Sequence, residues 1–281
     1  MTLKNKLHKI FKRKKKHTVA VIKLSGVIGK VSNFSNGLSL ESVAFTEKIE
    51  KISNLSAVAL IINSPGGSPV QSELISKKIK SLAKDKKDNN VPIFSFCEDV
   101  AASGGYWLAL TGDEIYASNN SIIGSIGVIS SGFGFQDAIK KLGIERRVHS
   151  QGKNKSVLDP FQKPKSDDVK LINSIQKDIH ENFIDFVKTN RKDKLTMSDD
   201  EVFNGKFWSG KQAKEIGLID GIGFYEDILK EKYGKDVTLK NIEGSKGFFR
   251  KKFAANYQIN FITSIVSEIL NEISLWSRYK F

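Results

Sequence analysis

The stretch VALIINSPGG at residues 58–67 decides the fold class. Its first half, Val58–Ile62, is a short apolar run rich in β-branched residues, which is typical of a buried strand. The Asn-Ser-Pro-Gly-Gly turn ends that strand, and apolar residues at helical spacing follow over Ser72–Leu82. A strand that passes through a glycine-rich turn into a helix is typical of the crossover units of a parallel sheet.

The same alternation extends on both sides of this stretch. Strands are predicted at Thr18–Leu24 and Pro92–Phe96, with helical spacing between the first two strands at Leu40–Ile52. The order predicts an α/β fold with a mainly parallel sheet flanked by helices, connected right-handedly. Further strands are predicted at Glu114–Ala117, Ile126–Ser130 and Glu145–Ser150, and further helices after Ala101, at Phe135–Leu142 and at Asp167–Arg191.

Basic residues are concentrated at the amino terminus. The formal net charge is +14, and the first 16 residues hold eight Lys or Arg, with no acidic residue before Glu41. Apolar side chains recur there at helical spacing, at Leu3, Leu7, Ile10 and Phe11. Two interpretations of residues 1–17 stay open: peripheral binding to an anionic membrane surface, or a solvated terminus. No nucleic-acid motif accompanies the charge, so we expect no nucleic-acid partner.

The sequence shows neither a secretory signal nor an apolar run that could span a bilayer. We therefore expect a cytoplasmic location, with peripheral contact at the inner face of the cell membrane. The single cysteine, Cys97, excludes an internal disulfide and fits a reducing compartment, where we expect it to be a small buried apolar residue. A second helical pattern over Ile259–Trp276 predicts a terminal amphipathic helix, which would dock on the body, on a second subunit or on a membrane.

Three glycine-rich segments are candidates for chemistry, at residues 63–67, 101–106 and 124–129. The first two follow strands and precede helices, where open α/β folds place ligands. Gly67 and Gly104 are candidate N–H donors for a developing oxyanion. Ser103, flanked by small residues, is a candidate nucleophile, although a serine that only caps a helix would look similar.

A serine nucleophile needs a base, and the residues alone leave its identity open. His149 and His180 are the histidines outside the amino-terminal tail. A desolvated lysine is the other choice, because burial disfavours the ammonium form. Spacing alone cannot select among so many lysines.

In order along the chain, four segments resemble the S49 peptidases, the signal peptide peptidase A and SohB group of the ClpP/crotonase-like superfamily. The segments are IINSPGG at 61–67, AASGGY at 101–106, GSIGV at 124–128, and GKFWSGKQA at 205–213 followed by GLID at 217–220. The similarity runs from about Val19 to Tyr225. It implies a ClpP/crotonase-like fold of repeated β-β-α units, and a domain over residues 18–235 between the tail of residues 1–17 and a carboxyl-terminal extension of residues 236–281.

The resemblance also implies roles for individual residues. Ser103 would be the nucleophile, Lys155 the general base with Lys153 as the alternative, and Ser125 the residue that orients the lysine. Gly67 and Gly104 would form the oxyanion hole. The remaining substrate-binding positions would be Gly66, Gly105 and Gly127, and no metal or cofactor is expected.

The resemblance implies peptide substrates such as cleaved signal peptides, and a homo-oligomeric ring, of which an octamer is one form, in which neighbouring subunits complete the sites. A crotonase-like acyl-CoA enzyme would need a carboxylate pair that the sequence does not clearly supply. An inactive membrane-surface scaffold of the same fold is the other alternative.

Overall fold

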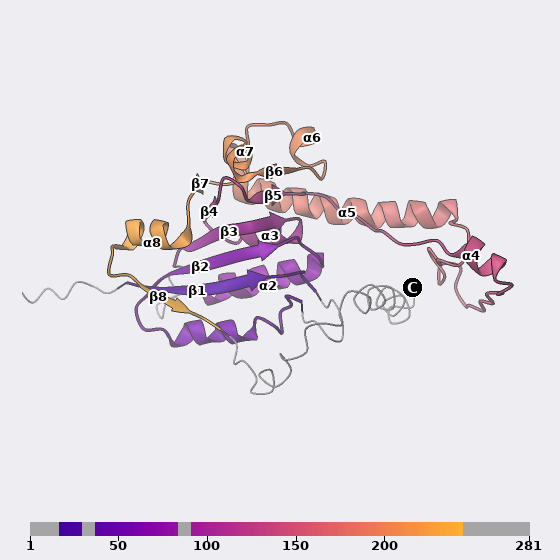
Figure 1. Cartoon of the computed structure of the whole chain (residues 1–281), viewed down its shortest axis with the longest axis horizontal. Helices are drawn as coiled ribbons and strands as arrows, with labels where there is room; N and C mark the ends of the chain where they lie inside the picture. Colours follow the sequence, from indigo (N-terminus) through magenta and orange to yellow (C-terminus); the bar gives the residue numbers. More distant parts are fainter. Residues whose placement is uncertain (1–16, 30–36, 84–90, 244–281) are drawn as a thin grey trace, which may run out of the picture. The chain divides into compact units, whose positions relative to one another are not determined.

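The computed structural model describes residues 17–29, 37–83 and 91–243 (Figure 1). The chain divides into two compact units. The sheet unit comprises Met1–Ile126 and Asp185–Ser245, and the second unit comprises Gly127–Ile184 and Lys246–Phe281.

The sheet unit is built on one eight-stranded sheet of the described residues, in the order β6-β5-β3-β2-β1-β8. β4 pairs with β3 and also with β7, off this path. Every strand pair is parallel except β5 with β6. The strands are β1 (Thr18–Ser25), β2 (Leu55–Ser64), β3 (Ile93–Ala102), β4 (Glu114–Ala117), β5 (Ile122–Gly124), β6 (Phe207–Ser209), β7 (Gly221–Ile222) and β8 (Thr238–Asn241).

Strand β3 changes its partner along its length. Residues Phe94–Cys97 pair with β4, whereas residues Val100–Ala102 pair with β5. On the other side of β3, the register with β2 shifts after Ile62, so that Ser64 lies opposite Ala101. The carboxyl ends of β2, β3 and β5 therefore meet at one edge of the sheet, which is where parallel sheets place ligands.

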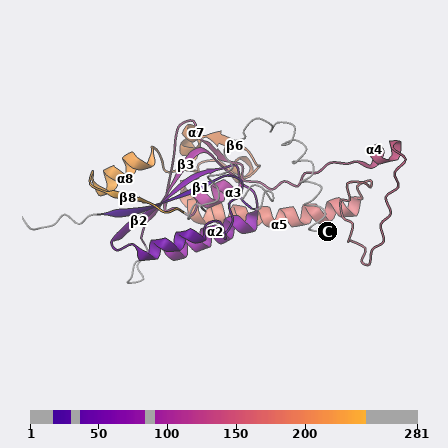
Figure 2. The ribbon, with the colours of Figure 1, turned by 60° about the horizontal axis from the view of Figure 1, so that its bottom comes forward.

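Helices cover both faces of the sheet, as a parallel sheet with two buried faces requires. One face packs on α8 (Tyr225–Tyr233), and its buried cluster includes Val21, Ala59, Phe96 and Leu229. The opposite face packs on α3 (Gly104–Ala109), which in turn packs on α2 (Pro69–Leu82). Figure 2 shows α2 and α8 on opposite sides of the sheet. The remaining elements of this unit are η1 (Ala44–Lys51), η2 (Lys192–Lys194), α6 (Asp199–Val202) and α7 (Gly210–Glu215).

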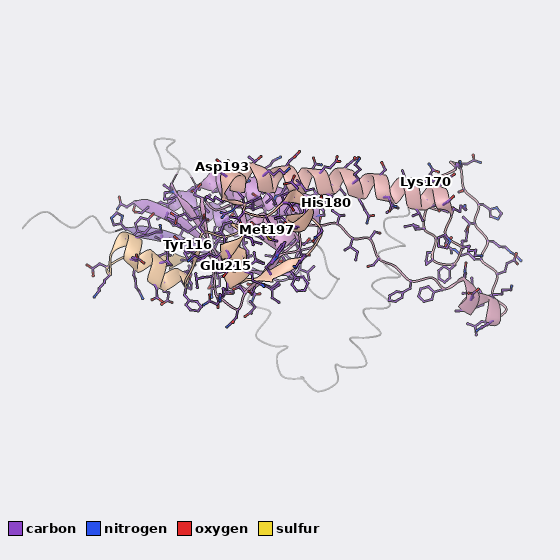
Figure 3. All side chains as sticks on the ribbon, turned by 90° about the horizontal axis from the view of Figure 1, so that it is seen from above. Tyr116, Lys170, His180, Asp193, Met197 and Glu215 are labelled. Atoms are coloured by element: carbon purple, nitrogen blue, oxygen red, sulfur yellow. The ribbon has the colours of Figure 1, made fainter. Side chains whose placement is uncertain are left out.

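The second unit has few buried side chains. It contains α4 (Gln136–Lys141), which buries no residue, and most of α5 (Ser166–Arg191), along which Figure 3 labels Lys170 and His180. Among its described residues, the buried hydrophobic side chains are Val157 and Phe183. Large apolar side chains of this unit are instead exposed: Ile129, Phe133, Leu142, Ile144, Val148, Val169, Leu171 and Ile175.

Most predicted elements are confirmed, and the mostly parallel sheet flanked by helices is the predicted fold class. Two predicted strands are wrong. The strand assigned to Ile126–Ser130 lies instead at Ile122–Gly124, because the positive φ of 53° at Ser125 breaks the extended backbone before Ile126. Residues 145–150 form no strand, and all of them are exposed. The helical segment at Leu40–Ile52 is a 3₁₀ helix over Ala44–Lys51.

Some predictions concern residues outside the described ranges. These are the basic tail, of which only residue 17 is described, and the helix over Ile259–Trp276. The predicted division at residues 235 and 236 stays a prediction, and β8, which lies beyond it, pairs with β1. No helix in the described ranges combines the length and the apolar character needed to cross a membrane.

Candidate active site

Ser103 occupies the tight turn between β3 and α3. Its backbone has φ 52° and ψ −122°, an uncommon conformation for a residue other than glycine. Its side chain does not cap α3, which removes the helix-capping interpretation. Among the described residues its Oγ has no hydrogen-bond partner, and the residue is half-buried. A serine on a strained strand-to-helix turn with a free hydroxyl is suited to nucleophilic attack.

The glycine loop after β2 lies directly on this turn. Gly66 has φ 107°, and a Cβ atom there would lie 2.8 Å from Ser103 Cβ and 2.9 Å from Gly104 N. Ile28 fixes the loop from the other side, since its N–H donates to Gly66 O at 2.8 Å and its carbonyl accepts from Ser68 N at 2.8 Å. Only glycine fits at position 66, because the loop comes this close to the Ser103 turn.

Two backbone N–H groups beside Ser103 have no partner among the described residues. Within the described part of the chain, neither Gly67 N nor Gly104 N donates a hydrogen bond. The two glycines are neighbours, because a Cβ at Gly104 would lie 3.4 Å from Gly67 N. A Cβ at Gly67 would lie 2.0 Å from Ile28 O, so this position also excludes side chains. Unpartnered, rigidly held N–H groups are what stabilisation of an oxyanion requires.

Ser125 lies next to Ser103 in the sheet register. Ala102 and Gly124 are register partners, and each serine directly follows one of them. Ser125 has φ 53°, and its N–H donates to Lys206 O at 2.8 Å. The structure thus brings Ser103, Ser125, Gly67 and Gly104 to one edge of the sheet.

The three predicted substrate-binding glycines differ in their surroundings. Gly66 and Gly105 are buried, and a Cβ at Gly105 would lie 2.3 Å from Ser64 O. Both therefore have a packing role whether or not they bind a substrate. Gly127 is half-buried and belongs to the second unit.

The candidate bases also belong to the second unit. Lys155 is exposed, and its N–H closes a turn on Gly152 O at 3.2 Å. Lys153 Nζ lies 3.7 Å from an Asp167 carboxylate oxygen. Lys155 forms no such ion pair with any residue that the structure describes. His149 and His180 are in the same unit. All four candidate bases therefore lie in the second unit, and the structure gives their positions only relative to that unit.

Sequence reasoning gave no role to an ion-pair cluster that supports the sheet. Asp220 accepts hydrogen bonds from Arg191 at 2.8 Å and from Lys194 at 2.6 Å. The backbone N–H of Ile115, in β4, donates to it at 2.8 Å. Burial would raise the pKa of Asp220, but the hydrogen bonds from Arg191 and Lys194 outweigh burial and hold that pKa below its ordinary value. The GLID segment at 217–220 was the only sequence signal for this cluster.

Two further observations concern the other reactive side chains of the described residues. Burial raises the pKa of the Cys97 thiol to about 12, so this cysteine is no nucleophile in the folded state. In the described ranges, no group of three His, Cys, Asp or Glu side chains could hold a metal ion.

Known proteins resemble the chain in both sequence and fold. The model of peptidase family S49 matches residues 85–239. A putative protease of Methanocaldococcus jannaschii is 33% identical over 221 residues, which cover 76% of this chain and 68% of that protein. A putative signal peptide peptidase SppA of Enterococcus faecium is 33% identical over 214 residues, 75% of this chain and 61% of that protein.

Two other similarities differ in coverage or in identity. A Brucella abortus protein named Na(+)/H(+) antiporter NhaA is 46% identical over 237 residues, 83% of this chain but only 32% of that protein. The solved structure of a mutant membrane-bound stomatin-specific protease in complex with a substrate peptide has a TM-score of 0.50 at 16% identity. It covers 82% of this chain and 94% of that one, and it supports the fold. The family match and the M. jannaschii relative together establish that this chain belongs to peptidase family S49.

Proposed function

We propose that the chain is a serine endopeptidase that cleaves peptide bonds through an acyl-enzyme on Ser103. The observation that carries the proposal is the free Ser103 hydroxyl on a strained turn beside two unpartnered N–H groups, Gly67 and Gly104. Membership of family S49 supports the same reaction. A crotonase-like enzyme would not need this nucleophile.

The reaction follows from the proposed roles. Lys155 takes the proton of the Ser103 hydroxyl as Oγ bonds to the carbonyl carbon of the peptide. The carbonyl oxygen becomes an oxyanion that accepts hydrogen bonds from Gly67 N–H and Gly104 N–H. The C–N bond then breaks, and the amine leaves with the proton from Lys155. Lys155 then takes a proton from a water molecule as the water oxygen bonds to the ester carbonyl carbon. The bond from that carbon to Oγ breaks, Oγ takes the proton back from Lys155, and the carboxylic acid product leaves.

Ser125 is proposed to orient the lysine amine. Its register position beside Ser103 supports this role, because a hydroxyl there would reach a group that approaches Ser103. The hydrogen bond from its N–H to Lys206 O holds its backbone, and the Trp208 ring lies 2.7 Å from where a Cβ of the preceding Gly124 would be.

We propose membrane-associated peptides, including cleaved signal peptides, as the substrates. The names of relatives support this class: one is a putative signal peptide peptidase, and the stomatin-specific protease has a structure with a peptide substrate. We also propose a homo-oligomer, an octameric ring being one form, because the second unit exposes large apolar side chains such as Phe133 and Leu142. Residues 1–17 would add peripheral contact with an anionic membrane at the cytoplasmic face.

The test is covalent labelling of the full chain with a fluorophosphonate, followed by intact-mass measurement and peptide mapping. We expect a single adduct on Ser103 in the wild type and none in Ser103→Ala, which should fold normally. Hydrolysis of fluorescein-labelled casein should disappear in the same variant. If Ser103→Ala still cleaves casein at the wild-type rate, the proposal is wrong. An unlabelled, folded and inactive wild type would favour a scaffold that has lost catalysis.

A further inference from the structure

Ser72 is buried in the first turns of α2, with 0% of its surface exposed. Its hydroxyl donates a hydrogen bond to the carbonyl of Ser68 at 3.0 Å. Ser68 is the residue after Gly67, and its own Oγ caps α2 by accepting from Gln71 N. The Ser68 carbonyl also accepts the backbone N–H of Ser72 at 3.1 Å, so the hydroxyl adds a second bond at the end of the glycine loop that carries Gly67 N–H.

The same hydroxyl lies beside the Cα of Gly104, the residue that carries the other donor. The space where a Cβ of Gly104 would lie is bounded by three atoms: Ser72 Oγ at 2.6 Å, Ile28 Cδ1 at 3.2 Å and Gly67 N at 3.4 Å. There is room at Gly104 only for hydrogen, and Ser72 is the closest of the three neighbours. Ser72 thus lies against both loops that supply the proposed donors.

We infer that Ser72 is a positioning residue for the oxyanion hole, and this inference rests on the proposed peptidase function. Its size and its bond to Ser68 set the spacing between Gly67 N–H and Gly104 N–H. Such donors must lie 2.7–3.1 Å from the oxyanion, and loss of one costs about 10²–10³-fold in kcat. A displacement of about 1 Å in catalytic geometry costs about 10²-fold. An extra methyl group at position 72 would push Gly104 from its place.

The test compares Ser72→Val with Ser76→Val in the full chain. Ser76 lies one turn further along the same buried face of α2, is 3% exposed, and bonds to Thr111 instead of approaching Gly104. Both substitutions add the same volume to the same helix and remove one buried hydroxyl. We expect both to lower the unfolding temperature, Ser72→Val through the crowding at Gly104 and Ser76→Val through the lost bond from Thr111, so the unfolding temperature of each is measured.

Catalysis should separate the two variants. Kinetics use a quenched-fluorescence peptide that the wild type cleaves, at a temperature where both variants are folded. Ser72→Val should lower kcat about 100-fold with KM within about twofold, because only the transition state carries the oxyanion. The affinity of Ser72→Val for a peptide aldehyde, which forms a tetrahedral adduct, should fall by a similar factor. Ser72→Ala, which loses only the bond to Ser68, should lower kcat several-fold. Ser76→Val should keep the wild-type kcat.

Three outcomes decide between the possibilities. A Ser72→Val variant with wild-type kcat and aldehyde affinity overturns the inference. Equal losses of kcat in Ser72→Val and Ser76→Val also overturn it, because they indicate a general packing effect. Failure of the proposed peptidase function is recognised separately: in that case the Ser103→Ala variant would still cleave the peptide.

Discussion

The backbone N–H of Ser103 donates a 2.7 Å hydrogen bond to the carbonyl oxygen of Gly124. Because Ala102 and Gly124 are register partners, this bond continues the β3–β5 pairing one residue beyond the end of β3. The chain turns immediately there, with φ 52° at Ser103 and φ 53° at Ser125. The sheet therefore holds two strained serines side by side, and ladder hydrogen bonds stabilise the backbone of each, from Ser103 N to Gly124 O and from Ser125 N to Lys206 O.

The close approach of Gly66 to this turn predicts that Gly66→Ala disrupts the site. The new Cβ would meet Ser103 Cβ at 2.8 Å and two backbone atoms, Ala102 O and Gly104 N, at 2.9 Å. Backbone cannot move aside cheaply, so we expect at least a 10-fold slower labelling of Ser103 by a fluorophosphonate, and a lower unfolding temperature.

Gly205→Ala is the matched control for that substitution. Gly205 has a similarly positive φ of 84°, but nothing lies within 4 Å of its Cβ direction. It should lose about 1 kcal/mol of stability from backbone strain alone and keep the wild-type labelling rate. If Gly66→Ala is labelled as fast as Gly205→Ala, the tight contact with Ser103 has no catalytic consequence.

The Asp220 cluster predicts a specific dependence of stability on pH. The pKa of Asp220 is lowered in the folded state, so its interactions stabilise the fold at pH values above the ordinary aspartate pKa of about 3.9. That contribution is lost as the pH falls through the lowered pKa. At pH 7, Asp220→Asn should cost about 3 kcal/mol, because it leaves the buried charge of Arg191 without its partner.

Urea unfolding of the wild type and Asp220→Asn at several pH values would measure this. The difference between them should shrink as the pH is lowered below about 4. Glu73→Gln is the control, since the exposed pair of Glu73 with Lys77 should contribute under about 0.5 kcal/mol. A difference that stays constant down to the acid transition would show that the charge of Asp220 is not what stabilises the cluster.

The sequence predicted most strands and helices well and the backbone conformation of single residues poorly. Strands such as β1 and β2 were found because β-branched runs end in clear turn residues. β5 was misplaced because SIIG at 121–124 and IGVIS at 126–130 have similar composition, and the positive φ of Ser125 between them depends on the long-range bond to Lys206 O. The glycine and serine loops of the site were readable from motif and spacing. Ser72, Trp208 and Asp220 were not, because their roles come from contacts with residues distant in the sequence.

Burial of Cys97 predicts an unreactive thiol in the native protein. Burial raises its pKa to about 12, so almost no thiolate exists at pH 8. We expect no reaction with Ellman's reagent over an hour in buffer, and one equivalent of reaction in 6 M guanidinium chloride. The native enzyme should also keep full activity after incubation with iodoacetamide. Rapid native labelling that abolishes casein cleavage would instead place Cys97 in an accessible and functional environment.

The two candidate lysines predict opposite results on substitution. Lys153 Nζ has the Asp167 carboxylate as a neighbour at 3.7 Å, whereas Lys155 Nζ has no ion pair within the described ranges. Because Lys155 is the proposed base, Lys155→Ala should lower kcat about 10³-fold, which is within the usual range for loss of a general base. Lys155→Arg places a permanently charged guanidinium there that cannot act as a base at neutral pH, so it should be equally inactive. Lys153→Ala should keep at least half of the wild-type kcat, with unfolding temperatures confirming that all three variants are folded.

Two outcomes would contradict this prediction. An active Lys155→Arg would show that position 155 supplies charge and not proton transfer. An inactive Lys153→Ala together with an active Lys155→Ala would identify Lys153 as the base.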